Sequence, residues 1–426
     1  MQIIKYPQRD QWSKIIERPV FDVSSLHETV TTILDDVKRN GDNAVFLYEE
    51  KFDKVKLTTL QADQEEIDNS EYQIPQELKS AIETAAENIR RFHSAQKIQS
   101  TKIETTPGVV CWQKPVGIEK VGLYIPGGTA PLFSTVLMLA IPAKIAGCKE
   151  VILCTPPNKE GNINPAILFA AKTAGVDKIF KAGGVQAIGA MAYGTETIPK
   201  VYKIFGPGNQ YVTAAKQIVS LKDAAIDMPA GPSEVQVIAD DSADPAFIAS
   251  DLLSQAEHGA DSQVILTTTS EHLIASVMEE IEKQLSKLPR RDMAEKALQN
   301  SKAILLKNNE EIIELTNEYA PEHLIIETEN YNELAEKVIN AGSVFLGHYT
   351  PESAGDYASG TNHTLPTNGY AKAYSGVNLD SFIRKITFQE ISKEGISNLG
   401  KTIEVMAENE LLYAHKNAVS LRIKQD

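Results

Sequence analysis

Four short apolar runs decide the fold: VGLYIP (121–126), EVILCTP (150–156), KIFKAGG (178–184) and VYKIFG (201–206). The segments between them have the spacing of helices, at 132–146, 165–174 and 187–193. Short apolar runs that alternate with helices are typical of a parallel sheet that is covered on both faces. The middle of the chain therefore predicts one α/β unit.

The same alternation begins again after Gly231. The predicted strands are VQVIAD (235–240), QVILTTT (263–269), AILLKN (303–308), HLIIE (323–327) and SVFLG (343–347). Asp244 and Pro245 form a typical helix start between the first two of these strands. We therefore expect an α/β protein with two Rossmann-like parallel-sheet units, a helical N-terminal region and a helical C-terminal tail.

The two ends of the chain look different from its middle. Helical spacing runs over 25–50 and 75–96. A hairpin-like segment follows at 108–119, where Pro and Gly interrupt the pattern. The tail from about 396 to 425 also has helical spacing, but it has too few apolar positions for a core of its own. We expect this tail to pack on another subunit.

Length and composition exclude several classes of protein. The chain has 426 residues, of which 42% are hydrophobic and 23% charged, and a formal net charge of −15. Such an acidic balance argues against a nucleic-acid partner, which requires a basic face. The start MQIIKYPQRDQW has no apolar signal region, and the most apolar stretch, 132–146, is too short to span a bilayer. Three cysteines without a CxxC pair suit a reducing compartment, so we expect a cytoplasmic protein with no membrane partner.

Two pairs of polar residues could carry chemistry in the second unit. Gln255 and His258 lie near the end of the helix that Asp244 opens, and Gly259 is a typical stop for it. Glu322 and His323 lie at the start of a predicted strand, where a carboxylate and an imidazole would provide two bases of different strength. Adjacent residues of a regular strand point to opposite faces, so a shared site requires an irregular backbone there.

Further candidates lie near the end of the chain. The stretch HYTPESAGDYASGTNHTLPTNG (348–369) has no periodicity and contains Asp356 and His363; a loop this long is usually functional or disordered. The tail adds Glu410 and His415. Residues five apart on a straight helix are separated by about 140° around its axis. These two side chains can therefore face one site only where the helix is interrupted.

The candidates suggest a metal and a nucleotide. His258, Asp356 and His415, with a neutral Gln oxygen, form a set of nitrogen and oxygen donors without thiolate, which suits zinc or a similar divalent ion. Gly-rich turns follow three predicted strands, at 126–131, 181–189 and 205–211. Backbone N–H groups in such turns can approach an anionic group, so a nucleotide cleft is expected at this edge of the sheet.

Several motifs carry a resemblance to a known family. They are GLYIPGG (122–128), FGPGN (205–209), AGPSE (230–234), QAEHG (255–259), APEHL (320–324), SAGDYASGTNHTLPT (353–367) and AHKNAV (414–419). Together, in this order, they resemble histidinol dehydrogenase, from about residue 20 to the end of the chain.

The resemblance implies an activity and its residues. The family oxidises L-histidinol to L-histidine through an aldehyde, with two NAD and one water, in the last step of histidine biosynthesis. By motif, the zinc ligands correspond to Gln255, His258, Asp356 and His415, and these also contact the substrate. The catalytic pair corresponds to Glu322 and His323, of which His323 contacts the substrate too. NAD contacts correspond to Tyr124, Gln186 and Asn209, and further substrate contacts to Ser233, His363 and Glu410.

The resemblance also implies a domain arrangement. Residues 1–20 form an N-terminal arm, 21–123 with 234–375 form a first α/β domain that carries the metal and catalytic residues, and 124–233 form an inserted second α/β domain on the NAD side. Residues 376–426 form a helical tail. The family is a homodimer in which the tail of one subunit completes the site of the other.

Three alternatives remain open at this stage. A relative with the same metal and NAD residues could act on another small alcohol, such as a sulfonated diol, although a sulfonate should favour a cationic pocket where this chain has Glu410 and His363. A zinc hydrolase could use Glu322 to activate water without a cofactor. A non-catalytic binding protein would leave the Glu-His pair, the metal-type ligands and the Gly turns unexplained.

Overall fold

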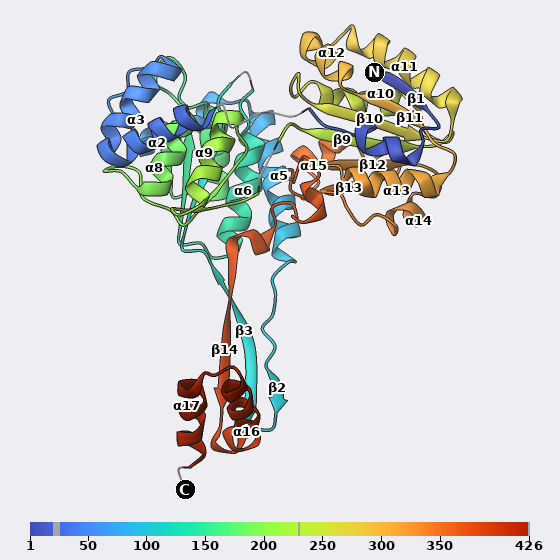
Figure 1. The fold of residues 1–426 in the computed structure, drawn as a ribbon. Helices are drawn as coiled ribbons and strands as arrows, with labels where there is room; N and C mark the ends of the chain where they lie inside the picture. Colours follow the sequence, from blue (N-terminus) through green and yellow to red (C-terminus); the bar gives the residue numbers. More distant parts are fainter. Residues whose placement is uncertain (20–25, 129, 229–230, 425–426) are drawn as a thin grey trace.

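The chain forms two parallel α/β units and a long antiparallel stalk that ends in two helices (Figure 1). The computed structural model describes residues 1–19, 26–128, 130–228 and 231–424. The expected boundary between arm and first domain at 20/21 lies outside these residues, as do Ser25 at the start of the first helical run and Thr129 in the first Gly-rich turn. The two expected Rossmann-like sheets are confirmed.

The first unit, called the β4 unit below, is built on a five-stranded parallel sheet. Its strands lie in the order β6 (Lys178–Lys181), β5 (Glu150–Thr155), β4 (Lys120–Tyr124), β7 (Lys203–Phe205) and β8 (Ala225–Ile226). The helices between the strands begin and end as expected from their residues. In α7, for example, Asn164 caps the first turn, Pro165 is the first helical residue and Gly175 ends the helix in the left-handed conformation.

Helices from the N-terminal region cover both faces of this sheet. One face packs against α5 (Gln76–Ser94), α6 (Phe133–Ile145) and α7 (Pro165–Ala174), with α4 (Gln64–Gln73) outside them. The other face packs against α2 (His27–Asn40), α3 (Asp42–Tyr48), α8 (Gly184–Tyr193) and α9 (Gln210–Ser220). A π-helical turn, Glu49–Asp53, follows α3. The packing therefore groups 27–94 with the sheet of the β4 unit, whereas the sequence-based division had assigned these residues to one domain with 234–375.

The second unit, called the β9 unit below, is built on a six-stranded parallel sheet. Its strands lie in the order β1 (Gln2–Lys5), β11 (Lys302–Leu305), β10 (Gln263–Thr268), β9 (Glu234–Ala239), β12 (His323–Glu327) and β13 (Ser343–Leu346). The N-terminal arm thus provides an edge strand. Every residue of β9, β10 and β12 is buried, which is typical of parallel strands that are covered on both faces.

The helices of the β9 unit form its two outer layers. Their bounds are α10 (Pro245–Ala256), α11 (Glu271–Leu285), α12 (Arg291–Gln299), α13 (Asn309–Tyr319) and α14 (Tyr331–Ala335). The first three share a core with one face of the sheet. The last two share the other face with Trp12, from the arm segment that holds a 3-10 turn (Arg9–Gln11) and α1 (Trp12–Ile15). Beyond β13 the chain forms α15 (Glu352–Tyr357).

The stalk differs from the expected helical tail. After two 3-10 turns, Tyr370–Lys372 and Leu379–Phe382, the chain forms the strand β14 (Ile383–Ile391). This strand pairs antiparallel along the whole of β3 (Val109–Gly117), which also pairs with β2 (Ile103–Thr106). The hairpin turn lies before β3, so the expected hairpin at 108–119 is a single strand. Only α16 (Lys393–Asn409) and α17 (Tyr413–Ile423) are helical, and they lie at the far end of the stalk (Figure 1).

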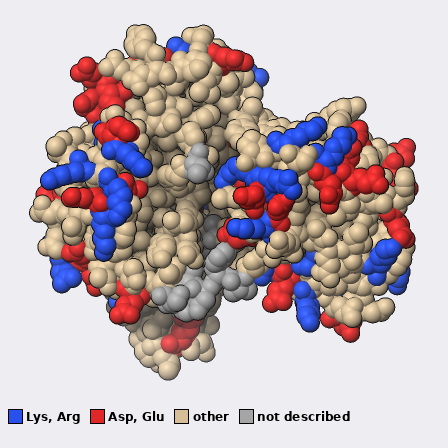
Figure 2. Space-filling view, turned by 90° about the horizontal axis from the view of Figure 1, so that it is seen from above, with Lys and Arg blue, Asp and Glu red and all other residues tan. Residues whose placement is uncertain are grey.

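Two surface properties bear on partners. Seen from above, Lys and Arg side chains are interspersed with Asp and Glu over both units (Figure 2). Among the described residues, no helix is both long enough and apolar enough to cross a membrane.

Candidate active site

The topology of the β9 unit brings the two pairs of candidate residues together. Strands β9 and β12 are parallel neighbours that start at Glu234 and His323, so their amino ends share one edge of the sheet. Helix α10 follows β9 and runs back across the sheet, as a crossover helix does, so its last turn returns to that same edge. Gln255 and His258 at its end therefore reach the start of β12.

A cavity of about 190 Å³ lies here, between the two units. Its walls include seven of the residues expected from sequence: Ser233, Gln255, His258, Glu322, His323, Asp356 and His363. The β4 unit closes it with residues that include Thr135, Lys216 and Asp227. Residues from distant parts of the chain thus meet at one place.

Glu322 and His323 form a buried acid–base pair. Glu322 precedes β12, so the strict alternation of a strand does not apply to it, and both side chains line the cavity. The backbone N–H of Glu234 donates to Oε2 of Glu322 at 2.9 Å. Burial raises the pKa of Glu322 to about 8, although His323 opposes the shift. A carboxyl group of this basicity suits proton transfer near neutral pH.

One hydrogen bond fixes how His323 can act. Its Nδ1 lies 3.1 Å from the backbone oxygen of Glu234, which can only accept, so Nδ1 carries a proton. Its Nε2 is buried without a hydrogen-bond partner and lies 3.7 Å from Oδ1 of Asp356. Burial opposes a charge on the ring, but the carboxylates of Glu352, Glu322 and Asp356 outweigh it and raise the pKa of His323. Nε2 is therefore the atom that can exchange a proton with a molecule in the cavity.

A group of metal-type donors lies next to this pair. His258, Glu352 and Asp356 each place a possible ligand atom within 4.8 Å of the others. Burial alone would raise the pKa of Asp356, but three histidines outweigh it and hold the pKa below its usual range, so this carboxyl is ionised. Two converging carboxyl groups, of which that of Glu352 is buried, and an imidazole suit a divalent ion of the zinc type. The donor set therefore fits the expected metal.

Gln255 lies against the same group. Its amide forms two hydrogen bonds when the nitrogen faces Glu352 and the oxygen faces the N–H of Glu234, at 3.0 Å. Its side chain is fully buried, so its position is fixed by α10 and by these neighbours. If the amide group is rotated by half a turn, its oxygen faces the carboxyl cluster, where it could bind a cation.

His363 is anchored from two sides. Its Nδ1 lies 2.9 Å from the backbone oxygen of Asp356, and its Nε2 lies 3.0 Å from Oγ1 of Thr135. Thr135 belongs to the β4 unit, so this contact ties the loop of one unit to the first turn of α6 in the other. Burial lowers the pKa of His363, which favours a neutral ring.

The tail residues do not join the site of their own chain. Glu410 and His415 are exposed and lie at the far end of the stalk (Figure 1). The expected interruption between them is present: α16 ends at Asn409, Leu411 adopts a φ of 61°, and α17 starts at Tyr413. The two side chains therefore sit on different helical segments, and the interruption frees them from the angular spacing of one straight helix.

A larger cavity, of about 760 Å³, lies on the β4 unit. Tyr124 and Gln186 both line it, as expected. The hydroxyl of Tyr124 accepts from the N–H of Gly184 at 3.0 Å, and Nε2 of Gln186 donates to the buried Glu49 at 2.8 Å. Asn209 does not line this cavity: its Oδ1 caps α9 by accepting from the N–H groups of Tyr211 and Val212 in the first turn, while Tyr211 itself lines the wall.

The Gly-rich turns follow β4, β6 and β7 at the carboxyl edge of their sheet. At Gly206, φ is +125° and a Cβ would lie 2.0 Å from the backbone oxygen of Tyr124, so only glycine fits. The segment 130–135 connects the two cavities: Ala130 and Pro131 line the larger, and Leu132 and Thr135 line the smaller. The two cavities are therefore neighbours.

Glu352 is the principal residue that the sequence reading missed. It is buried within the metal-type group, four residues before Asp356 on α15. Side chains at i and i+4 share one face of a helix. That spacing within PESAGDY was a signal that could have identified it.

Two of the three cysteines are unsuited to act as nucleophiles. All three are free thiols. Burial raises the pKa of Cys148 to about 11 and the pKa of Cys154 still further. Neither forms a thiolate near neutral pH, so acyl transfer through these two residues is excluded.

A second buried acid pair consists of Asp251 on α10 and Glu327 at the carboxyl end of β12. Burial raises the pKa of Asp251 to about 7, and burial together with the nearby Asp251 raises the pKa of Glu327 to about 8. The folded state holds protons here that the unfolded chain releases above about pH 4. The protonated pair therefore stabilises the folded state fully in acid. This stabilisation is lost as the pH rises through about 7 to 8.

Replacing Glu327 by Gln should reduce this loss, because the amide stays neutral. We expect Tm of Glu327→Gln to fall less than that of the parent between pH 6 and pH 9, with a gain of about 2–4 °C at pH 9. Differential scanning calorimetry of both proteins at pH 6 and pH 9 measures the Tm. Glu310→Gln, which changes an exposed glutamate, is the control. An unchanged pH slope in Glu327→Gln would contradict the assignment.

Comparison with known proteins supports one family. The family model described as Histidinol dehydrogenase matches residues 16–423. Two relatives named histidinol dehydrogenase are that of Bacteroides thetaiotaomicron, 70% identical over 99% of both chains, and that of Escherichia coli K12, 54% identical over 97% of this chain and 95% of its own. The crystal structure of histidinol dehydrogenase from Elizabethkingia anophelis superposes with a TM-score of 0.98 and 57% identity, over 100% of this chain and 98% of that one.

Proposed function

The chain belongs to the histidinol dehydrogenase family, and from this premise we propose that it oxidises L-histidinol to L-histidine with two NAD, at a zinc site shared between two subunits. It is an oxidoreductase of histidine biosynthesis. We expect it to act in the cytoplasm, with which its free thiols accord.

The neighbouring cavities are the observation that carries the proposal. The smaller cavity holds an acid–base pair and a metal-type donor group, and the larger one lies on Gly-rich turns and has the size of a nucleotide site. Because the segment 130–135 runs from the wall of the larger cavity to the wall of the smaller one, a dinucleotide in the larger cavity would have its reactive ring next to the smaller one. A hydrolase would need only the smaller cavity, and a binding protein would need no buried acid–base pair.

When bound, zinc would orient histidinol through its amine and imidazole nitrogens, and NAD would accept the hydride. We propose that Gln255, His258 and Asp356 bind the metal, with His415 from a second copy of the chain. Glu352 holds Gln255 in place. Tyr124 and Gln186 line the NAD site on the β4 unit, and Asn209 shapes it by capping α9.

His323 acts in the first oxidation. In its neutral form His323 takes the hydroxyl proton of histidinol at Nε2 while the hydride leaves the carbinol carbon, and its Nδ1 stays hydrogen-bonded to Glu234. The product of this step is the aldehyde. Its imidazole and amine keep it in the cavity, so the second step can follow without release.

Glu322 acts between the two oxidations. In its ionised form it takes a proton from water, which adds to the aldehyde carbon, and the hydrate then loses a second hydride while His323 takes the hydroxyl proton. His323 and Glu322 release the protons that they have taken to solvent between the steps. The sum is one alcohol and one water converted to one carboxylate, with two hydrides transferred to NAD and three protons released. Ser233 and His363 contact the substrate, and Glu410 from the second copy pairs with its cationic end.

The exposed apolar surface of the stalk supports a dimer. Large apolar side chains are exposed on it: Ile386, Phe388, Val405, Met406, Leu411, Leu412, Tyr413 and Leu421. A monomer rarely exposes so many apolar groups together, and such surfaces mark interfaces. The helices α16 and α17 pack on each other and hardly at all on the two units, so the tail is available to a second copy.

Counting NADH tests the proposed function. With limiting histidinol we expect two NADH per histidinol, a loss of activity after chelation, and recovery when zinc is returned. The count follows from oxidation of an alcohol to an acid. One NADH with accumulated aldehyde would contradict the role of Glu322, and no NADH from zinc-loaded protein would contradict the function.

A further inference from the structure

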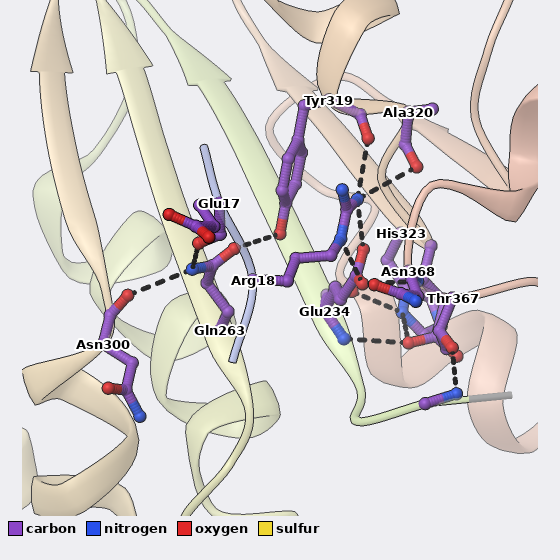
Figure 3. A network of polar contacts seen from close by, with 12 residues as sticks. Glu17, Arg18, Glu234, Gln263, Asn300, Tyr319, Ala320, His323, Thr367 and Asn368 are labelled. Carbon is purple, nitrogen blue, oxygen red and sulfur yellow. Dashed lines mark hydrogen bonds and ion pairs between the residues drawn. The ribbon is translucent and has the colours of Figure 1, made fainter. Parts of the chain in front are cut away.

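Arg18, at the end of the N-terminal arm, is largely buried in a polar network, and the mechanism above gives it no role (Figure 3). Its guanidinium forms a two-pronged ion pair with Glu234: Nε donates to Oε1 at 2.6 Å and Nη2 donates to Oε2 at 2.8 Å. The side chains are 15% and 3% exposed, so water screens the pair little. Its Cζ also lies 4.0 Å from the centre of the Tyr319 ring.

Glu234 connects this ion pair to the catalytic pair. Its backbone oxygen accepts from Nδ1 of His323 at 3.1 Å, and its backbone N–H donates to Oε2 of Glu322 at 2.9 Å. Its carboxylate also accepts from the N–H of Asn368 at 2.6 Å. One residue at the start of β9 therefore holds both catalytic side chains by its backbone and is itself held by Arg18.

Arg18 also holds the turn that precedes Glu322. Its Nη2 donates to the backbone oxygen of Tyr319 at 2.7 Å and to that of Ala320 at 3.4 Å. Ala320 has a φ of +53°, a left-handed conformation that costs energy in any residue with a Cβ. Such a conformation persists only where neighbouring contacts fix it, and Arg18 provides two of them.

The arm is fixed in turn by the sheet. Nε2 of Gln263 donates to the backbone oxygen of Glu17 at 3.0 Å, and Oε1 of Gln263 accepts from the hydroxyl of Tyr319 at 3.0 Å (Figure 3). The arm therefore cannot shift without moving the residues that precede the catalytic pair.

We propose that Arg18, through Glu234, is a positioning residue for Glu322 and His323. It keeps the Nδ1 proton of His323 on the backbone of β9, so that Nε2 stays directed into the cavity. This role rests on the proposed function, because it assigns Arg18 to the proton transfers described above. A merely structural ion pair would affect folding but not the chemistry of the folded protein.

Arg18→Met and Arg18→Lys test the proposal, and Arg9→Met is the matched control, since Arg9 is an exposed arginine of the same arm paired with Glu314. Arg18→Lys keeps the charge but not the two-pronged geometry. In both Arg18 variants kcat should fall by about 10- to 100-fold, the usual effect of removing a partner that orients a reacting group. KM for histidinol should change by less than about threefold, because the substrate contacts are intact.

A second readout does not depend on activity. In the parent, Nδ1–H of His323 should give a slowly exchanging proton NMR resonance, identified by its absence in His323→Asn. This resonance should be lost or broadened in both Arg18 variants and kept in Arg9→Met. If the parent did not oxidise histidinol, the proposed function would fail, whereas this resonance would still test the positioning.

These outcomes distinguish a positioning role of Arg18 from a purely structural one. If Arg18→Met does not fold, the kcat and the resonance of Arg18→Lys test the proposal. A folded Arg18 variant with the kcat and the resonance of the parent overturns the proposal. So does a variant whose activity falls only in step with its folded fraction in calorimetry.

Discussion

His323→Asn should lower kcat for histidinol by about 10²- to 10⁴-fold, the range that a general base contributes. The amide cannot take a proton, whereas Nε2 of His323 is buried, has no hydrogen-bond partner and faces the cavity. Both oxidations need this proton transfer, so both should slow. Stopped-flow measurement of NADH formation resolves the two steps.

Binding should survive the same change. His323 is not among the proposed metal ligands, so zinc content and the Kd of histidinol should stay within about threefold of the parent. His272→Asn, which changes an exposed histidine on α11, should leave kcat unchanged. A His323→Asn enzyme with parental kcat would refute the assignment of the base.

Glu322→Gln should instead affect the two oxidations to different extents. Because Glu322 is assigned to the hydration of the aldehyde, the second oxidation should slow more than the first, and aldehyde should accumulate. Trapping the aldehyde with a hydrazine reagent measures it. Equal losses in both steps would show that Glu322 and His323 act as one unit.

Local sequence patterns predicted most of the β strands. The apolar runs at 121–126, 150–156 and 235–240 correspond to β4, β5 and β9, because strands buried on both faces must be continuously apolar. The resemblance assigned Glu322 and His258 to one site, and both line the same cavity. Their meeting also has a physical cause: a crossover helix returns to the edge where the next parallel strands begin.

Long-range packing could not be read from the same patterns. The helix 27–40 shows which of its faces is apolar, but periodicity does not say which sheet that face covers, and it covers the β4 sheet. Strand β14 pairs with β3, more than 260 residues earlier in the chain, and its side chains are almost all exposed, so no alternation marked it. Arg18 carried no local signal, since its partner lies 216 residues away.

The tail is the region where the site implied by the sequence motifs and the structure of a single chain differ most. His415 belongs to the same ligand set as His258 by resemblance, yet it is exposed on α17, at the end of the stalk. The proposed metal site therefore requires two copies of the chain, each of which donates its tail to the other. Alone, His258→Ala and His415→Ala should each be almost inactive, because each removes one imidazole ligand from every site.

Mixing these two variants tests the shared site most directly. After unfolding and refolding together, half of the dimers should contain one copy of each, and one of the two sites in such a dimer combines an intact body with an intact tail. The mixture should therefore recover about one quarter of the parental activity, as random assortment of subunits in a symmetric dimer requires. A mixture that stays as inactive as its components would contradict a site built from two chains.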